Sequence, residues 1–360
     1  MNASHADANA GTRAVDEHRR FDEQALTSWM SDNVDGFAGP MEVLEFNGGQ
    51  SNPTYQLVTP GRKYVLRRKP PGDIIKGAHA VDREARILSA LGTVDFPVPE
   101  IFGFCTDNAV IGTWFYVMEM IEGRIFWDAT FPDVNPNERH LYFDAMNCAL
   151  AQLHQIDPDA IGLSDYGRHG QFFERQISRW SKQYHQDTAA GRNDHMDALI
   201  SWLPDNIPDE VGSTIVHGDF RCDNMIFHPT EPRILGVLDW ELSTLGQPLA
   251  DFSYHAMMYR MPPEIVAGLA DADLASLKIP TESEYIAAYC QSTGRSGIDN
   301  WDFYMAFNFF RLAGIFHGIK GRVIRGTAAS AHAKERAVAF PRLAELAHDA
   351  MLACINARDN

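Results

Sequence analysis

Cysteine is scarce in this 360-residue sequence: there are five, an odd number, and none lies in a Cys-x-x-Cys pair. A disulfide framework and a zinc knuckle are therefore not expected, and a reducing compartment, the cytoplasm, suits the chain best. The sequence also has no run that approaches the roughly 18 apolar residues of a membrane-spanning helix. We find no internal repeat. These absences leave an ordinary globular protein as the expectation.

Positive charge is also in short supply, with 31 Lys and Arg against 48 Asp and Glu, for a formal charge of −17. Such a surface repels nucleic acid and anionic membranes, so neither is expected as a partner. Hydrophobic residues make up 45% and charged residues 22%, which is typical of a chain that buries a core. Residues 1–20 lack the basic-then-apolar order of a signal peptide and are predicted to be a disordered tail.

The first part of the chain has the pattern of a small β-rich lobe. Alternating or apolar segments predict strands at residues 41–46, 53–58, 63–67 and 114–120, with a Pro60-Gly61 turn between the second and third. Apolar residues at helical spacing predict a helix over residues 81–91, which Gly92 would end. We assign residues 21–120 to this N-lobe.

Beyond residue 123 most segments have helical patterns, except for an island at residues 214–239 where three apolar runs alternate with polar loops. We assign residues 121–355 to a larger, mostly helical C-lobe. Together the two lobes make an α+β protein.

The strongest chemical signal is His217-Gly218-Asp219-Phe220-Arg221-Cys222-Asp223-Asn224, which is followed by Val237-Leu238-Asp239. Mg²⁺ prefers oxygen ligands and keeps several waters, so Asn224 and Asp239 would suffice as protein ligands beside nucleotide phosphates. Asp219, held apart from the metal, would accept the proton of an attacking hydroxyl. This pattern indicates phosphoryl transfer.

A hairpin explains how the two metal ligands converge. The apolar run at 225–227 leads into a turn between Pro229 and Pro232, and residues 234–238 return. That path is predicted to bring Asp239 back beside Asn224.

These motifs resemble the aminoglycoside phosphotransferase family, small-molecule kinases with a two-lobed protein-kinase-like fold. Within it, the sequence is most similar to the phosphotransferase domain fused to some acyl-CoA dehydrogenases. The similar stretches are Gly48-Gly49-Gln50-Ser51-Asn52, residues 64–71, residues 175–184 and Arg311-Leu312-Ala313-Gly314-Ile315. The resemblance implies a magnesium-dependent kinase that uses ATP, with GTP as the alternative nucleotide.

The resemblance also implies which residues of the N-lobe bind the nucleotide. The segment Gly48, Gly49, Gln50, Ser51 and Asn52 lies between two strands, where glycines let backbone amides approach phosphates. Arg67 stands where the fold carries its phosphate-binding lysine, and strand alternation places it on the same face as Val65.

Two further N-lobe assignments follow. Glu84 is the expected partner of Arg67, although a solvated glutamate on the helix face is an equally good interpretation. Glu119 and Met120 resemble the hinge whose backbone would bind adenine.

Two residues of the C-lobe are expected to give structural support rather than chemistry. His217 would brace the catalytic loop, and Asp251 matches a family aspartate that anchors the loop from a following helix. Cys222 has no evident base beside it and is not expected to be a nucleophile.

The acceptor is expected to be a small molecule, because the eleven residues between Asp239 and Asp251 leave no room for a long activation segment. Basic residues of the segment 308–325 favour an anionic acceptor such as a hydroxyacyl-CoA or hydroxy acid, although ion pairing within the lobe would also explain them. The acidic C-lobe favours a cationic aminoglycoside instead. A non-catalytic nucleotide-binding pseudokinase is a third alternative, which Arg67 keeps open.

Overall fold

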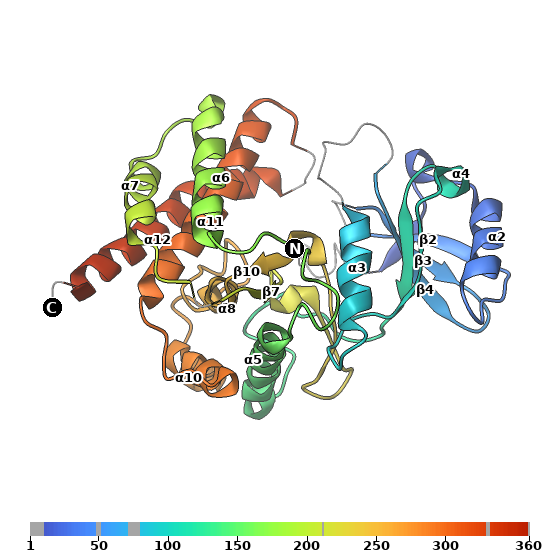
Figure 1. Ribbon diagram of the computed structural model, residues 1–360, viewed down its shortest axis with the longest axis horizontal. Helices are drawn as coiled ribbons and strands as arrows, with labels where there is room; N and C mark the ends of the chain where they lie inside the picture. The colour runs from blue at the N-terminus through green and yellow to red at the C-terminus, as the bar shows by residue number, and fades with distance from the viewer. Residues whose placement is uncertain (1–10, 48–51, 71–79, 211, 329–331, 359–360) are drawn as a thin grey trace. The chain divides into compact units, whose positions relative to one another are not determined.

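A computed structural model describes residues 11–47, 52–70, 80–210, 212–328 and 332–358. They form two compact units (Figure 1). Unit 1 comprises Met1–Trp127, Asp159–Leu163 and Cys222–Leu242, and unit 2 comprises Asp128–Pro158, Ser164–Arg221 and Ser243–Asn360. In the described ranges no helix is both long and apolar enough to cross a membrane.

Unit 1 is built on a six-stranded antiparallel sheet with the strand order β1-β2-β3-β4-β6-β5. Its strands are β1 (Thr12–Ala14), β2 (Glu42–Phe46), β3 (Thr54–Val58), β4 (Lys63–Arg68), β5 (Ile101–Cys105) and β6 (Phe115–Glu119). Its helices are η1 (Glu17–Arg19), α2 (Glu23–Asn33), α3 (Val81–Leu91), α4 (Asn108–Ile111), η5 (Cys222–Asn224) and η6 (Trp240–Leu242). A separate hairpin joins β8 (Met225–Phe227) to β9 (Ile234–Val237).

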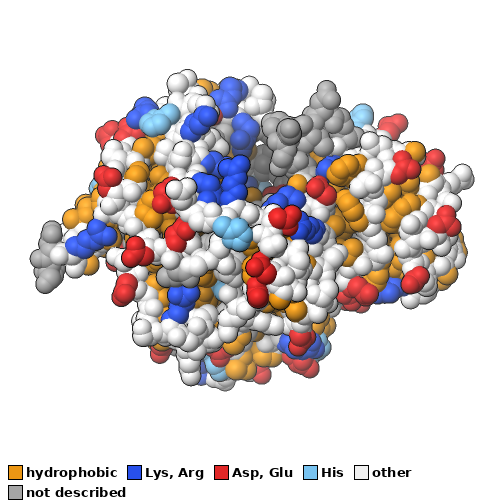
Figure 2. Space-filling view, in the orientation of Figure 1, with side chains coloured by type: hydrophobic (Ala, Val, Ile, Leu, Met, Phe, Trp, Pro, Cys, Tyr) orange, Lys and Arg blue, Asp and Glu red, His pale blue; other side chains and the backbone are white. Residues whose placement is uncertain are grey.

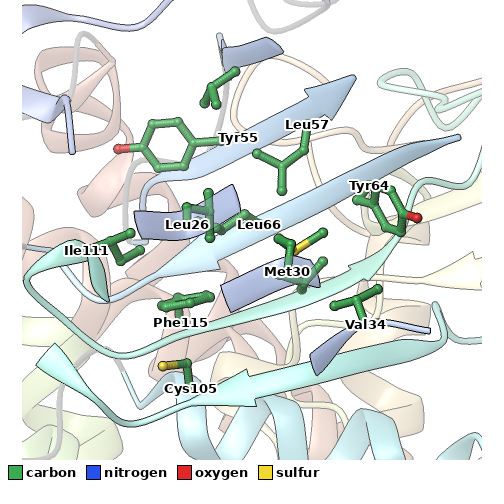
Figure 3. Close-up of a cluster of buried hydrophobic side chains, with 12 residues drawn as sticks. Leu26, Met30, Val34, Tyr55, Leu57, Tyr64, Leu66, Cys105, Ile111 and Phe115 are labelled. Atoms are coloured by element: carbon green, nitrogen blue, oxygen red, sulfur yellow. The ribbon is translucent and has the colours of Figure 1, made fainter. Parts of the chain in front are cut away.

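The two faces of the sheet carry different side chains because successive residues of a strand point to opposite sides. On one face, alternate residues of β3, β4 and β6 pack against α2 in a buried apolar cluster (Figure 3). Leu26 and Met30 of α2 are fully buried there. On the other face, Val65 and Arg67 point the same way, as alternation predicts, and meet α3.

Local sequence signals account for the elements of this sheet. The predicted helix matches α3 at both ends, and the Gly92 amide donates to the Leu88 carbonyl at 2.9 Å. Between β3 and β4, the Thr59 amide donates to the Arg62 carbonyl at 3.0 Å and closes the predicted Pro60-Gly61 turn. The β3–β4 hairpin and helix α3 therefore follow from turn chemistry and periodicity.

Residues 11–20 do not form the disordered tail that composition predicted. β1 pairs with β2, and the buried carboxylate of Glu45 accepts the Asp16 amide at 3.1 Å and a guanidinium hydrogen bond from Arg19. Arg68 Nη2 donates to the Arg19 carbonyl at 2.7 Å. Polar composition suggested disorder, but buried partners elsewhere in unit 1 order the segment. Residues 1–10 lie outside the described residues.

The division of the chain also differs from the predicted boundary after residue 120. The hairpin and its flanks, Cys222–Leu242, group with unit 1, as does the short segment Asp159–Leu163. A β-bridge links Arg124 to Phe227, and each of these residues donates its amide to the other's carbonyl at 2.8 Å. Sequence order alone did not reveal this pairing, because about 100 residues separate the two strands.

Unit 2 is mostly helical. Its helices are η2 (Pro136–Glu138), α5 (Arg139–Gln155), α6 (Phe172–Gln186), η3 (Thr188–Ala190), α7 (Asp194–Trp202), η4 (Leu203–Asn206), α8 (Pro248–Ala256), η7 (Met257–Tyr259), α9 (Leu274–Leu277), α10 (Glu282–Thr293), α11 (Trp301–Ile324) and α12 (Ala333–Arg358). Long α11 packs against α6, α8 and α12, and α5 packs against α10. A two-stranded ladder pairs β7 (Thr214–Val216) with β10 (Thr244–Gly246). The rings of Phe252 and Tyr289 stack in the aromatic core, with their centroids 3.8 Å apart.

Candidate active site

Unit 1 contains a cavity of about 630 Å³ on the face of the sheet opposite to the apolar cluster. Its walls come from β3, β4, α3, β6, the segment 119–127 and the β8–β9 hairpin. Apolar side chains form much of the wall, with Val65, Met118 and Ile226 among them. A few polar groups converge on one part of it, an arrangement typical of small-molecule sites.

Arg67 is the centre of that polar group. Its Nε lies 2.8 Å from Oε2 of Glu84, and its Nη2 donates to Oδ1 of Asp239 at 3.0 Å. Glu84 is 2% exposed, so the structure confirms the pairing with Arg67 and excludes the solvated helix-face alternative. One guanidinium therefore joins the β4 strand, the α3 helix and the segment that follows β9.

Two neutral donors hold Glu84 from its other sides. Asn52 Nδ2 donates to Oε1 at 2.7 Å, and Tyr116 Oη donates to Oε2 at 3.0 Å. Burial raises the pKa of Glu84, while the charge of Arg67 and these two hydrogen bonds oppose the rise. Burial lowers the pKa of Arg67, but the nearby Tyr116 and carboxylates raise it above its ordinary value, so its charge is permanent. Arg67 is thus a fixed cation in the cavity wall, paired with two carboxylates.

The β8–β9 hairpin confirms the predicted return of Asp239 toward Asn224. Met225 pairs with Val237, and the Leu238 amide donates to the Asn224 carbonyl at 2.8 Å. Asp239 has a φ of 64°, a left-handed conformation that few residues other than glycine adopt. Such strain persists only where surrounding structure fixes it and is frequent at functional sites. Its side chain remains about one-third exposed, at 35%.

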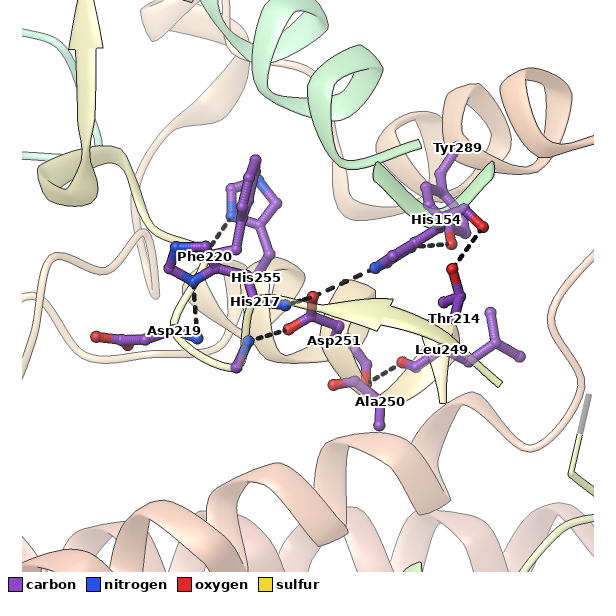
Figure 4. A network of polar contacts seen from close by, with 12 residues as sticks. His154, Thr214, His217, Asp219, Phe220, Leu249, Ala250, Asp251, His255 and Tyr289 are labelled. Atoms are coloured by element: carbon purple, nitrogen blue, oxygen red, sulfur yellow. Dashed lines mark hydrogen bonds and ion pairs between the residues drawn. The ribbon is translucent and has the colours of Figure 1, made fainter. Parts of the chain in front are cut away.

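In unit 2, the loop after β7 carries Asp219, and its backbone joins the network of polar contacts around His217 and Asp251 (Figure 4). Tyr254 Oη donates to Oδ1 of Asp219 at 2.5 Å, and Arg221 Nε lies 3.9 Å from the same oxygen. The Asp219 amide donates to Nδ1 of His217 at 3.2 Å. Burial raises the pKa of Asp219. Arg221, the Tyr254 hydrogen bond and other nearby cations lower this pKa by more than burial raises it, so the net shift is downward. Asp219 is therefore a carboxylate at neutral pH.

Asp251 of α8 holds the backbone of this loop. Its Oδ2 accepts the His217 amide at 2.7 Å and its Oδ1 accepts the Gly218 amide at 2.8 Å (Figure 4). His154 Nε2 lies 3.3 Å from Oδ2. Burial raises the pKa of Asp251, but His154, His217 and the amide bonds lower it below its ordinary value. These contacts are those expected of an anchor for the loop.

The remaining predicted site residues are placed as follows. Glu119 and Met120 line the cavity at the end of β6, where the Glu119 amide donates to the Glu100 carbonyl at 2.8 Å. Asn52 contacts Glu84. Gly48, Gly49, Gln50 and Ser51 lie outside the described residues.

Sequence reasoning missed three residues of the site. The apolar pattern of residues 114–120 predicts only a strand residue at Tyr116, which the structure shows to be the cross-strand partner of Arg67. Tyr254 follows Asp251 by three residues, and that helical spacing was the available signal. Arg311 belongs to the basic segment 308–325, but no sequence pattern predicts that its Nη2 donates to the Gly218 carbonyl at 2.7 Å.

A family model described as "Phosphotransferase enzyme family" matches residues 42–307, and the chain belongs to this family. The family is one of phosphotransferases, and the fold is the α+β, two-lobed, protein-kinase-like fold that is found in this family.

Sequence relatives confirm the predicted subgroup. The chain is 42% identical over 341 residues to acyl-CoA dehydrogenase family member 10 of Mus musculus, covering 94% of this chain and 32% of that protein. It is also 42% identical over 348 residues to family member 11 of Gallus gallus, covering 93% and 44%. The chain thus spans less than half the length of the curated relatives it matches.

Solved structures show the same fold. A Ralstonia eutropha JMP134 protein assigned to the aminoglycoside phosphotransferases is 48% identical with a TM-score of 0.85, covering 92% of this chain and 98% of that one. An aminoglycoside phosphotransferase in complex with AMP-PNP and hygromycin B matches with a TM-score of 0.58 at 14% identity, covering 91% and 98%. The comparison with this second structure shows a shared fold alone.

Proposed function

We propose that this phosphotransferase moves the γ-phosphate of ATP to a hydroxyl of a small metabolite, with Mg²⁺ as cofactor. The observation that carries the proposal is the guanidinium of Arg67, which joins Glu84 and Asp239 in the cavity wall. A permanent, planar cation at the polar part of an apolar cavity suits a ligand that is aromatic at one end and polyanionic at the other. ATP has that form, and GTP is the alternative nucleotide.

The donor set fits Mg²⁺. Asn224 and Asp239 offer a carboxamide and a carboxylate oxygen, and the hydrogen bond between Leu238 and Asn224 holds their backbones together. In the part of the chain that the structure describes, no three His, Cys, Asp or Glu side chains form a cluster able to hold a metal. Two oxygen ligands with phosphates and water suit Mg²⁺. When bound, the ion would neutralise phosphate charge.

Asp219 is the proposed general base. The acceptor hydroxyl gives its proton to the Asp219 carboxylate while its oxygen forms a bond to the γ-phosphorus. The bond from that phosphorus to the bridging oxygen breaks, and ADP leaves with the electron pair. Four residues separate Asp219 from Asn224 in the sequence, so the base and the metal ligand follow each other closely along the chain. His217 and Asp251 would hold the backbone of this loop in a fixed conformation.

For the acceptor we favour an anionic molecule such as a hydroxyacyl-CoA or a hydroxy acid. Lys and Arg side chains gather over α6 (Figure 2), where Arg175, Arg179 and Lys182 recur at helical spacing. The adjacent α11 contributes Arg311, which contacts the catalytic loop. The two relatives at 42% identity are named acyl-CoA dehydrogenase family members, and this name also favours a CoA-linked acceptor. The likeness to the Ralstonia protein favours an aminoglycoside instead.

The test is transfer of labelled γ-phosphate from ATP to a panel of hydroxyacyl-CoAs, hydroxy acids and aminoglycosides. We expect phosphorylated acceptor and ADP in equal amounts, and a loss of at least about 100-fold in D219N with ATP affinity retained. Full activity of D219N would refute the base assignment. Nucleotide binding without transfer to any acceptor would favour the pseudokinase alternative.

A further inference from the structure

Tyr254 contacts the carboxylate of Asp219. Its hydroxyl donates to Oδ1 at 2.5 Å, a short hydrogen bond of the kind formed between a hydroxyl and a carboxylate. Tyr254 is 6% exposed and lies near the end of α8, so packing restrains its ring. Burial and the charge of Asp219 raise the pKa of Tyr254 far above its ordinary value. The phenol therefore remains a donor throughout the neutral range.

One helix holds both parts of the catalytic loop. Asp251, one turn before Tyr254 on α8, accepts the amides of His217 and Gly218 and thereby fixes the loop backbone. Tyr254 fixes the carboxylate of Asp219, which the same loop carries. Residues three apart share a face of a helix, so both contacts arise from one rigid element.

A third element supports the phenol. Arg311 of α11 places its guanidinium over the ring of Tyr254, 5.0 Å from the centroid, and donates to the Gly218 carbonyl at 2.7 Å. A cation over an aromatic face is favourable, and here it also lies beside the loop that carries Asp219. Arg311 thus couples the ring of Tyr254 to the backbone of the loop.

On the basis of the proposed function, we infer that Tyr254 is a positioning residue that orients the Asp219 carboxylate toward the acceptor hydroxyl and keeps it ionised. Asp219 faces charged or titratable groups from three elements: Tyr254 on α8, Arg311 on α11, and His217 and Arg221 in its own loop. Among them Tyr254 donates directly to the carboxylate and carries no charge of its own.

Removing the phenol oxygen has two predicted consequences. The Asp219 carboxylate loses a hydrogen bond that favours its charged form, so its protonation midpoint rises, by on the order of one pH unit. The carboxylate also loses its fixed orientation, which lowers kcat by about tenfold or more. A purely structural role of Tyr254 would lower thermal stability without moving the midpoint.

The experiment compares Y254F with Y259F in the full chain. Tyr259 is a matched control, because it is also buried, lies five residues further on, and its hydroxyl has no hydrogen-bond partner among the described residues. With aspartate labelled by ¹³C at the carboxyl carbon, NMR titration follows Asp219, whose resonance D219N identifies by its absence. The pH profile of kcat/KM for the accepted hydroxyl compound is measured in parallel.

We expect the Asp219 midpoint and the acidic limb of the pH profile to move to higher pH in Y254F and to stay in place in Y259F. An unmoved midpoint in folded Y254F, with active wild type, would overturn the role of Tyr254 and leave the proposed function intact. No transfer by the wild type would overturn the proposed function itself, and with it the catalytic meaning of the contact. If Y254F does not fold, 3-fluorotyrosine placed at position 254, a more acidic phenol and hence a stronger hydrogen-bond donor, must lower the same midpoint, and an unchanged one overturns the proposal.

Discussion

At the scale of single residues, the site depends on the geometry of one guanidinium. Arg67 contacts Glu84 through Nε and Asp239 through Nη2, so two edges of a planar group serve two carboxylates. A lysine ammonium is a compact point charge on a flexible stem and does not reproduce that fork. The arginine at this position is therefore a specific feature of the site.

We expect R67K to weaken the binding of MgATP about tenfold or more, even though the charge is kept, because the ammonium would lose one of the two carboxylate contacts. Calorimetric titration with a non-hydrolysable ATP analogue measures the change. R62K is the control, since the exposed guanidinium of Arg62 lies at the surface, over the ring of Phe102 and 3.9 Å from Glu100. Equal affinity of R67K and wild type would show that the phosphates are held elsewhere.

At the scale of elements, the pairing of β1 with β2 rests on a buried acid. Glu45 is 1% exposed and accepts hydrogen bonds from the Asp16 amide, Arg13 and Arg19. Burial raises the pKa of Glu45, but the Asp16 amide and the two arginines lower it more, so the net pKa lies below its ordinary value. The ionised form therefore stabilises the folded state.

E45Q should lower the free energy of unfolding at pH 7 by about 1 kcal/mol, the low end for such a group because both arginines are largely in water. The pKa of Glu45 is lower in the folded state than in the unfolded state. This stabilisation is therefore fully present at a pH above the unfolded-state pKa, and it disappears as the pH falls through the folded-state pKa. Urea unfolding of wild type and E45Q at several pH values measures the difference. Exposed Glu42 on the same strand gives the control E42Q, and a difference that persists in acid would contradict the assignment.

At the scale of the whole molecule, ligand binding should appear as global stabilisation. A ligand that binds only the native state at 100 times its Kd contributes about 2.7 kcal/mol. We expect MgATP to raise Tm and Mg²⁺ alone to leave it unchanged, because Asn224 and Asp239 are only two ligands and need phosphates to complete the site.

D239N should lose the magnesium-dependent part of that shift, while D35N, at an exposed turn, should retain it. Thermal unfolding with ATP, GTP and no nucleotide checks both variants. A shift with Mg²⁺ alone would mean that the chain holds the metal by itself, and no shift in the wild type would remove the support for a nucleotide site.

Much of the fold could be predicted because its signals are local. Helix α3 has both predicted ends, β3 and β4 meet at the predicted turn, and the hairpin brings Asp239 back to Asn224. Each of these depends on residues within about 15 positions of one another, where spacing and turn chemistry suffice. The same local pattern placed Arg67 and Val65 on one face.

From local patterns alone one could therefore predict β2, β3, β4 and β6, helix α3, the β8–β9 hairpin and the family. The same patterns also led to the proposed set of Asp219, Asn224 and Asp239. Tertiary structure alone decided that Glu45 orders residues 11–20 and that Tyr254 contacts Asp219. These partners lie roughly 30 or more residues apart in the sequence, on elements that packing brings together. Periodicity shows which face of an element is buried, but only packing selects the side chain that it meets.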